Sequence, residues 1–213
     1  MKIAVIGATG KQGGLLVQEA LKRGHEVTAI VRNRSKVMFS VVAVLEKDIF
    51  RLSAEDLKGF DAVICAFRAA EGQEEEYVTA TQHLISILKE LLQVRLLIVG
   101  GAGSLYVDPE QKTQLYQTKD FPKEYLPTAS NMAKSLQLLK QSDINWTYLS
   151  PSAEFDFEGL RTGRYTLGEE QLLVNSAGNS YITYADYAIA MMDEVEKPAH
   201  IRKRFTVVAE QIG

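Results

Sequence analysis

Cysteine and histidine are scarce in this chain. Cys65 is the single cysteine among 213 residues. One cysteine excludes an internal disulfide, and a reducing cytoplasm is the expected location. The three histidines, His25, His83 and His200, are scattered, and no His, Cys or carboxylate group has metal-ligand spacing. The sequence therefore predicts no metal site.

Excess positive charge and long apolar runs are missing too. The net charge is −3, which argues against nucleic acid or a membrane surface as a partner. No apolar run approaches the roughly 20 residues that cross a bilayer. Lys2 leads directly into a predicted strand, so we expect no signal peptide. With no linker rich in Pro, Gly or Ser, residues 1–213 are expected to form a single domain.

Apolar strands alternate with amphipathic helices along the chain. We predict strands at 2–7, 25–32, 41–48, 60–67, 94–101 and 144–151, and helices at 12–23, 76–92 and 129–141. Continuous apolar strands separated by helices are typical of a parallel sheet that is covered on both faces. The predicted fold class is α/β, a Rossmann-type doubly wound parallel sheet. Residues of about 150–200 would form a small C-terminal lobe on the substrate side.

Three glycines follow the first predicted strand, in the stretch "GATGKQG". Gly7 favours a tight turn, Gly10 allows a ligand to approach the backbone, and Gly13 allows the helix to pack close to the strand. Alone, this G-x-x-G-x-x-G spacing could be only a strand–helix turn. Between a buried strand and an amphipathic helix, it indicates a diphosphate at the helix N-terminus. The predicted dinucleotide loop comprises Gly7, Ala8, Thr9, Gly10, Lys11, Gln12 and Gly13.

The glycine loop and several later stretches resemble a known family. "GATGKQG" followed by a βαβ unit is similar to the short-chain dehydrogenase/reductase superfamily, in its atypical and extended branch. More narrowly, "AIVRNRSKV", "VGGAGSLYV", "WTYLSPSAEF", "RTGRYTLGEEQLLV" and "YITYADYAIAMMDEVE" resemble bacterial NAD(P)H-flavin reductases, relatives of biliverdin reductase B and NmrA-like proteins. The resemblance covers nearly the whole chain. It implies a Rossmann fold, a nicotinamide dinucleotide and a reductase activity that is itself often inferred in this group.

The end of the second predicted strand suggests which dinucleotide binds. An NAD site places an acidic residue there, but the nearest acid, Glu26, begins the strand, about 16 Å away at ~3.3 Å per residue. Arg32, and secondarily Arg34 or Lys11, could hold the 2′-phosphate of NADPH instead, although such residues are also often simply solvated. NADPH is therefore the predicted cofactor, and NADH stays open.

The resemblance implies further contacts to the dinucleotide. Asp48 would lie near the adenine, and Ala66 and Phe67 would line the adenosine side. Ser150 and Pro151 follow the sixth predicted strand, where related enzymes contact the nicotinamide.

The usual proton donor of the superfamily is absent. Most members carry a tyrosine four residues before a helical lysine, on the same helix face. Lys134 is present, but position 130 is serine. Ser104, Tyr106 and Lys134 are the candidate catalytic residues. Each has a plain alternative: a polar loop residue for Ser104, a packed ring for Tyr106 and a solvated amine for Lys134.

Without that acid, hydride transfer to a conjugated acceptor is favoured over ketone reduction. A ketone develops an alkoxide that needs stabilising, whereas a reduced flavin can be protonated by solvent. FMN or FAD is a candidate substrate, and Phe155, Phe157 and Arg161 could border it. The alternatives are a dinucleotide-binding redox sensor of the NmrA-like type and, less favoured, a sugar-nucleotide epimerase or dehydratase. The expected partner is a small-molecule acceptor, with monomer or homodimer open.

Overall fold

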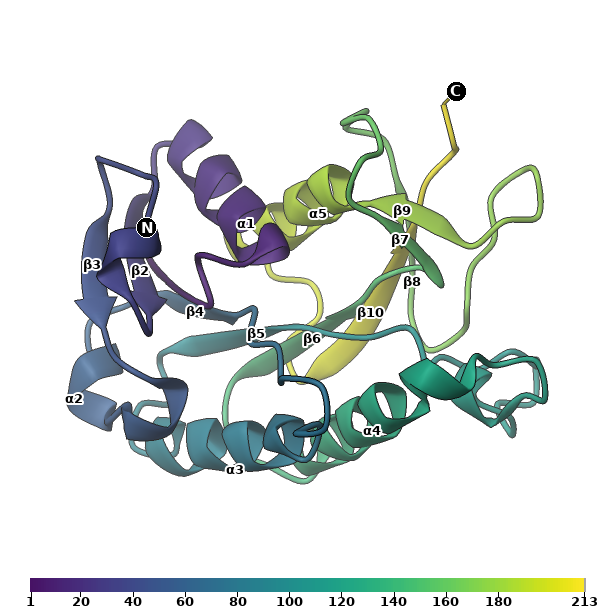
Figure 1. The fold of residues 1–213 in the computed structure, drawn as a ribbon, viewed down its shortest axis with the longest axis horizontal. Coiled ribbons are helices and arrows are strands. Elements are labelled where there is room, and N and C mark those ends of the chain that lie inside the picture. The colour runs from purple at the N-terminus through teal and green to yellow at the C-terminus, as the bar shows by residue number, and fades with distance from the viewer. Residues whose placement is uncertain (213) are drawn as a thin grey trace.

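A sheet of eight strands forms the centre of the protein, of which the computed structural model describes residues 1–212 (Figure 1). The strand order is β3-β2-β1-β4-β5-β6-β10-β8. Neighbouring strands are parallel from β3 to β10, and only β8 runs antiparallel, to β10. The strands are β1 (Lys2–Ile6), β2 (Glu26–Val31), β3 (Ala43–Glu46), β4 (Ala62–Cys65), β5 (Arg95–Val99), β6 (Trp146–Ser150), β8 (Thr166–Gly168) and β10 (Lys203–Val208).

The central strands are apolar along their whole length because helices cover both faces. Every residue of β4 and β6 is buried, and so are the last four of β1. Helices α1 (Lys11–Lys22) and α5 (Tyr184–Glu196) cover one face, and α3 (Glu76–Leu88) and α4 (Leu126–Lys140) cover the other (Figure 1). Burying both faces requires this run of β-branched and aliphatic side chains. The predicted doubly wound fold is confirmed.

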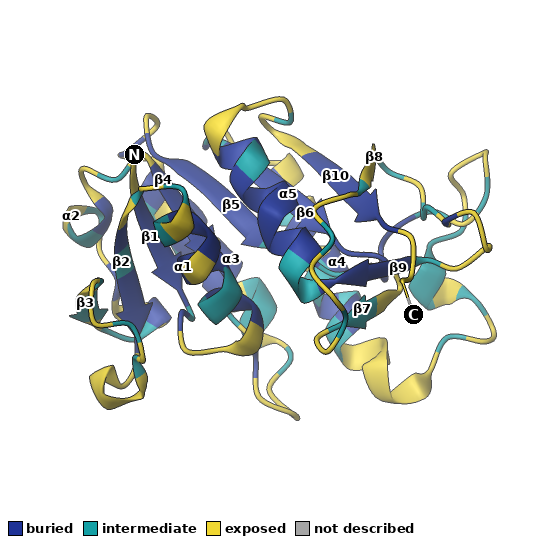
Figure 2. Cartoon of the chain, turned by 90° about the horizontal axis from the view of Figure 1, so that it is seen from above, coloured by how far each residue is buried: buried dark blue, intermediate teal, exposed yellow. Residues whose placement is uncertain are grey.

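Each helix layer packs through its own apolar cluster. On one side, Leu16 and Val17 of α1 share a cluster with Tyr187 and Met191 of α5. On the other, α3, α4 and Trp146 of β6 form a second cluster. Figure 2 shows the result, with buried strands inside and exposed residues concentrated in the connecting loops.

The strand order reverses between β1 and β4. The chain passes from β1 to β2 and β3 on one side, then crosses back to β4 on the other. In open parallel sheets the ligand crevice lies at this switch point, outside the carboxyl ends of the strands. The loops after β1, β2, β4, β5 and β6 therefore border the candidate site.

Some predicted boundaries differ from the structure. The helix predicted over 76–92 ends at Leu88, because a turn then buries Leu91 and leaves Leu92 57% exposed. The helix predicted over 129–141 starts earlier, at Leu126, with Pro127 in its first turn. Strands β8 and β10 were not predicted at all.

Smaller elements complete the chain. Strands β7 (Glu154–Asp156) and β9 (Tyr181–Thr183) form a separate parallel pair in the C-terminal lobe. The remaining elements are α2 (Ala54–Leu57) and the 3₁₀ helices η1 (Arg34–Lys36), η2 (Ile49–Arg51), η3 (Leu115–Gln117) and η4 (Lys123–Tyr125). Within residues 1–212 no helix has both the length and the apolar character of a membrane span.

Candidate functional site

The turn between β1 and α1 requires two of its glycines. Gly7 has a φ of +77°, and a Cβ on it would lie 2.6 Å from the Ala66 carbonyl oxygen. A Cβ on Gly13 would lie 2.1 Å from the carbonyl oxygen of Gly7. The first glycine is needed for backbone conformation and the second for the close approach of helix and turn. This is the strand–turn–helix geometry that the sequence predicted.

The N-terminus of α1 is prepared for an anion. Its N-cap, Gly10, has no side chain to cap the helix, and the first turn contains no acidic residue. The first backbone N–H groups of a helix have no acceptor within it, and the helix dipole adds positive potential there. A dinucleotide pyrophosphate fits this end of α1.

Gln12 connects α1 to the start of α5. Its side chain is buried and its Nε2 donates to the Tyr184 carbonyl oxygen at 3.3 Å. Its Oε1 is buried and accepts no hydrogen bond from residues 1–212. An unpartnered buried amide oxygen is costly, so a donor from a ligand at this turn would satisfy it.

Basic residues follow β2 and lie beside an acid that the sequence analysis missed. Arg32 and Arg34 are exposed, and Asn33 caps η1 by accepting from the Ser35 N–H at 2.9 Å. Glu46, at the end of β3, accepts from the Arg34 N–H at 3.2 Å. Only strand pairing brings Glu46 here, because β3 is aligned with β2 so that Glu46 lies opposite Val31.

The residues assigned to the adenosine side lie after β3 and β4. Asp48 Oδ1 accepts from the Phe50 N–H at 2.9 Å and thereby caps η2. Ala66 lies against Gly7. The Phe67 ring meets that of Phe50 edge to face, with ring centroids 6.0 Å apart. Asp48, Ala66 and Phe67 therefore all lie at the carboxyl edge of the sheet, as the glycine turn does.

Ser150 and Pro151 lie inside the protein at the end of β6. Both are buried, and the Ser150 hydroxyl has no hydrogen-bond partner within residues 1–212. The neighbouring Ser152 hydroxyl donates to the Val207 carbonyl oxygen at 2.7 Å. These residues lie at the predicted edge of the sheet, with the Ser150 hydroxyl enclosed.

The three candidate catalytic residues have different surroundings. Ser104 is 3% exposed, and its hydroxyl accepts from the Arg204 guanidinium at 2.8 Å. Tyr106 is fixed by its backbone, which pairs with Glu170 and Leu172 of the C-terminal lobe. Lys134 is exposed on α4 and forms no ion pair within the described chain. For Ser104 and Lys134 these positions fit the plain alternatives, an interior loop residue and a solvated amine.

Ser130, at the position of the expected tyrosine, bonds within its own helix. The Ser130 hydroxyl donates to the Pro127 carbonyl oxygen, one turn back in α4, at 3.1 Å. A serine bonded to its own helix cannot reach a substrate as a phenol would. On the same helix, the Met132 side chain lies against Gly101, and the Ser135 hydroxyl donates to the Asn131 carbonyl oxygen at 3.0 Å.

Comparison with known proteins agrees with this geometry. Residues 7–198 match the family described as NAD(P)H-binding. The chain belongs to the NAD(P)H-binding family. The uncharacterized protein YwnB of Bacillus subtilis (strain 168) is 60% identical over 211 residues, covering 99% of each chain.

Two solved structures are similar over essentially their full lengths. SP1627 of Streptococcus pneumoniae TIGR4, a proposed NADH-flavin reductase, is 43% identical with a TM-score of 0.93, covering 99% of this chain and 100% of its own. A proposed epimerase of Bacteroides thetaiotaomicron is 37% identical with a TM-score of 0.89, covering 100% of this chain and 98% of its own.

In this NAD(P)H-binding protein, aromatic rings of the C-terminal lobe border the glycine turn. Lys11 Nζ lies 4.4 Å from the centroid of the Phe157 ring. Phe155 packs against Tyr184 with ring centroids 3.9 Å apart and the ring planes tilted by 32°, and Phe157 meets the same ring edge to face. Arg161, expected beside a flavin phosphate, instead pairs with Glu19 of α1 at 3.0 Å. Phe157, of the predicted flavin border, therefore lies near the start of α1, whereas the Arg161 guanidinium pairs with Glu19 further along this helix.

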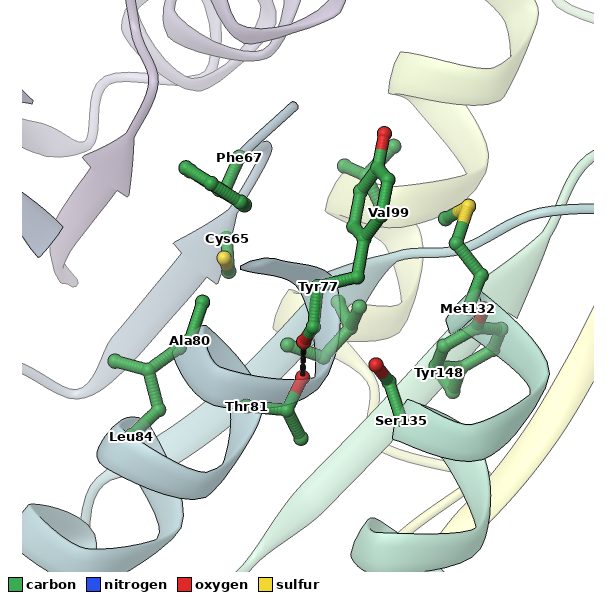
Figure 3. A pocket seen from close by; sticks show the side chains of 11 residues that line it. Cys65, Phe67, Tyr77, Ala80, Thr81, Leu84, Val99, Met132, Ser135 and Tyr148 are labelled. Atoms are coloured by element: carbon green, nitrogen blue, oxygen red, sulfur yellow. Dashed lines mark hydrogen bonds between the residues drawn. The ribbon is translucent and has the colours of Figure 1, made fainter. Parts of the chain in front are cut away.

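Two hollows of the described surface bear on where a ligand fits. A cleft of about 480 Å³ in the C-terminal lobe contains the carboxylates Asp156, Glu158 and Glu210, a lining that disfavours an anionic dinucleotide. A cavity of about 20 Å³, the size of one water molecule, lies between the ends of β4 and β5 and helices α3 and α4 (Figure 3). It is lined by Cys65, Phe67, Tyr77, Ala80, Thr81, Leu84, Ile98, Val99, Met132, Ser135 and Tyr148.

Proposed function

We propose that this protein is a cytoplasmic NADPH-dependent reductase that passes a hydride to a small, planar, conjugated acceptor such as FMN or FAD. One observation carries the proposal: a complete dinucleotide turn coexists with a serine hydroxyl at position 130 that is bonded back to Pro127. The first feature supports hydride chemistry. The second disfavours reactions that need the usual tyrosine acid.

The residues of the turn would hold the dinucleotide. Backbone N–H groups of Lys11, Gln12 and Gly13 would bind the pyrophosphate, and Arg32 and Arg34 the 2′-phosphate. Bound NADPH supplies a hydride donor. Glu46 lies beside Arg34 and would weaken the preference for the extra phosphate, so NADH is an expected second cofactor.

Positioning accounts for most of the expected rate enhancement. Holding two flat rings in contact converts a bimolecular transfer into an intramolecular one, which can lower the barrier by several kcal/mol. Phe155, Phe157 and Tyr184 form an aromatic cluster close to α1 against which a planar acceptor could pack. The similar structure SP1627 is described as a proposed NADH-flavin reductase, which supports a flavin among the acceptors.

A direct assay tests the proposal. Purified protein is mixed with NADPH and FMN, and the absorbance at 340 nm is followed, with soluble quinones and biliverdin as further acceptors. Catalysed oxidation of NADPH by at least one of them is expected. Tight NADPH binding with no turnover would favour the redox sensor instead. An epimerase, as proposed for the Bacteroides neighbour, is disfavoured because that chemistry also relies on the tyrosine that Ser130 replaces.

A further inference from the structure

Tyr77 is a phenol at the carboxyl edge of the sheet that sequence reasoning overlooked. It lies in the first turn of α3, where its carbonyl oxygen accepts from the Thr81 hydroxyl at 2.8 Å. Its ring stands between Phe67 and Met132 and its hydroxyl points away from the helix axis (Figure 3). Phe67 meets the ring edge to face, with centroids 5.9 Å apart. Aromatic contact thus fixes the ring at the end of β4.

The position of Tyr77 along the sheet corresponds to the nicotinamide half of a dinucleotide. The glycine turn follows β1, and the basic residues for the adenosine end follow β2. A dinucleotide that crosses the switch point must extend its other half over β4 and β5. Phe67, on the adenosine side, follows β4, and Met132 of α4 lies against Gly101 after β5, with its Sδ 3.0 Å from where a Gly101 Cβ would be. The Tyr77 ring lies between these two residues, on the β5 side of Phe67 (Figure 3).

The hydroxyl of Tyr77 is free to donate. Two other tyrosines lie near the ends of β5 and β6: the Tyr187 hydroxyl donates to the Leu149 carbonyl oxygen at 2.7 Å, and Tyr148, 1% exposed, accepts from the Gly101 N–H at 3.2 Å inside the core. The Tyr77 hydroxyl donates to no atom of residues 1–212. Burial raises the pKa of Tyr77, and the nearby Ala69 N–H and Arg68 offset this only in part. Tyr77 therefore keeps its proton at neutral pH.

We propose that the Tyr77 hydroxyl touches the acceptor and is its proton donor, which makes Tyr77 a catalytic residue. The inference rests on the proposed reductase function. As the acceptor gains a hydride from reduced dinucleotide at one carbon of its conjugated system, an electron pair moves to a heteroatom at the other end. Tyr77 gives its proton to that heteroatom, its O–H bond breaks, and the phenolate recovers a proton from water. In total, the acceptor gains one hydride, which carries both electrons, and one proton from Tyr77.

Proton donation by Tyr77 should matter more for some acceptors than for others, according to how basic the reduced acceptor is. An open-chain tetrapyrrole acquires a strongly basic nitrogen anion on accepting hydride, and a phenol can protonate it, whereas a quinone gives a hydroquinone anion that is no stronger a base than phenolate. A reduced flavin anion is a weaker base than phenolate, so its protonation by Tyr77 is unnecessary. Tyr77 therefore suits the open-chain tetrapyrrole, and FMN and the quinone serve as internal controls.

The test compares Tyr77→Phe with the wild type and with Thr79→Val. The first variant keeps the ring but removes the oxygen beside the Ala69 N–H, so its thermal unfolding is measured alongside that of the wild type. The second removes a hydroxyl from the exposed surface of the same helix. Steady-state kcat is measured with FMN, a soluble naphthoquinone and biliverdin. Separately, the affinity of the protein–NADP⁺ complex for biliverdin is measured from the absorption spectrum of the pigment.

We expect Tyr77→Phe to lower kcat with biliverdin by about 100-fold, the lower range for a general acid. Its rates with FMN and the quinone should stay within about twofold of wild type. Loss of one hydrogen bond should weaken biliverdin binding about fivefold. Thr79→Val should match the wild type throughout.

Three results would overturn the assignment. Equal kcat for Tyr77→Phe and wild type with every acceptor would exclude proton donation. An equal loss with all acceptors, FMN included, would make Tyr77 a positioning residue for the nicotinamide. Wild-type protein that binds NADPH but reduces none of the acceptors would refute the proposed function, and the assignment with it.

Discussion

Replacing Gly13 by alanine should disrupt the first turn of α1. The added Cβ would lie 2.1 Å from the Gly7 carbonyl oxygen, 2.8 Å from its carbon and 3.0 Å from the Ala8 Cα. All three are backbone atoms in a turn held by the Gly7 N–H to Ile30 and the Gly10 N–H to Gly7, so no flexible side chain can move aside. Helix and turn must separate, and we expect a loss of about 3 kcal/mol, the upper range for overpacking.

This loss can be measured by thermal and urea denaturation. In a chain of this size 1 kcal/mol corresponds to about 2–4 °C in Tm, so Gly13→Ala should melt about 6–12 °C lower. Calorimetric titration with NADPH should also show weaker binding, because separating helix from turn moves the N–H groups that would bind pyrophosphate.

Gly14 provides a matched control in the same helix. A Cβ there would meet its nearest neighbour, the Ala8 carbonyl oxygen, at 3.8 Å, an ordinary contact. Alanine is a better helix former than glycine, so Gly14→Ala should stabilise the protein by about 0.5–1 kcal/mol. If Gly13→Ala proved as stable as Gly14→Ala and bound NADPH normally, the close approach of helix and turn would not have the role assigned to it.

Three further predictions concern charge and reactivity. Arg32→Ala should weaken NADPH binding by about 10- to 100-fold, the range for a hydrogen bond to a charged group, and NADH binding by less than about twofold. Equal losses of affinity for the two dinucleotides in calorimetry would refute the assignment of Arg32 to the 2′-phosphate. Burial tends to raise the pKa of Glu194, but bonds from His200 and Arg95 outweigh it and leave the pKa below its usual 4.5. The unfolded chain then binds that proton more readily, so the free energy of unfolding should fall as the pH drops below about 4.5. In urea titrations, Glu194→Gln should make this fall with pH less steep. An unchanged slope would assign the loss of stability in acid to other carboxylates. Burial raises the pKa of Cys65 to about 11. A thiol reagent should therefore modify native protein at least about 100-fold more slowly than protein unfolded in urea, and similar rates would show that the thiol is accessible.

Local sequence was sufficient for the dinucleotide turn and for the parallel core. The turn at Gly7 depends on backbone sterics within a few residues, and such short-range constraints can be read from residue type and spacing. The apolar runs that became β1, β4, β5 and β6 were equally plain, because a strand buried on both faces tolerates few polar side chains. Even the absence of the usual acid at Ser130 was visible in the sequence.

The surroundings of the candidate catalytic groups depended on contacts between distant segments. Ser104 is held by Arg204, 100 positions away, because the unpredicted strand β10 pairs with β6. Arg161 was expected at a ligand but pairs with Glu19, 142 positions away. Tyr77 reaches the sheet edge because α3 packs beside Phe67, and nothing in the residues around it indicated that position.

The sequence by itself thus determined the strand–turn–helix that would hold a dinucleotide, because hard-sphere limits on the backbone act between near neighbours. Only the tertiary structure decided which hydroxyls are enclosed and which rings lie beside Tyr77. Those outcomes depend on strand order and helix packing, which join residues that no local pattern relates.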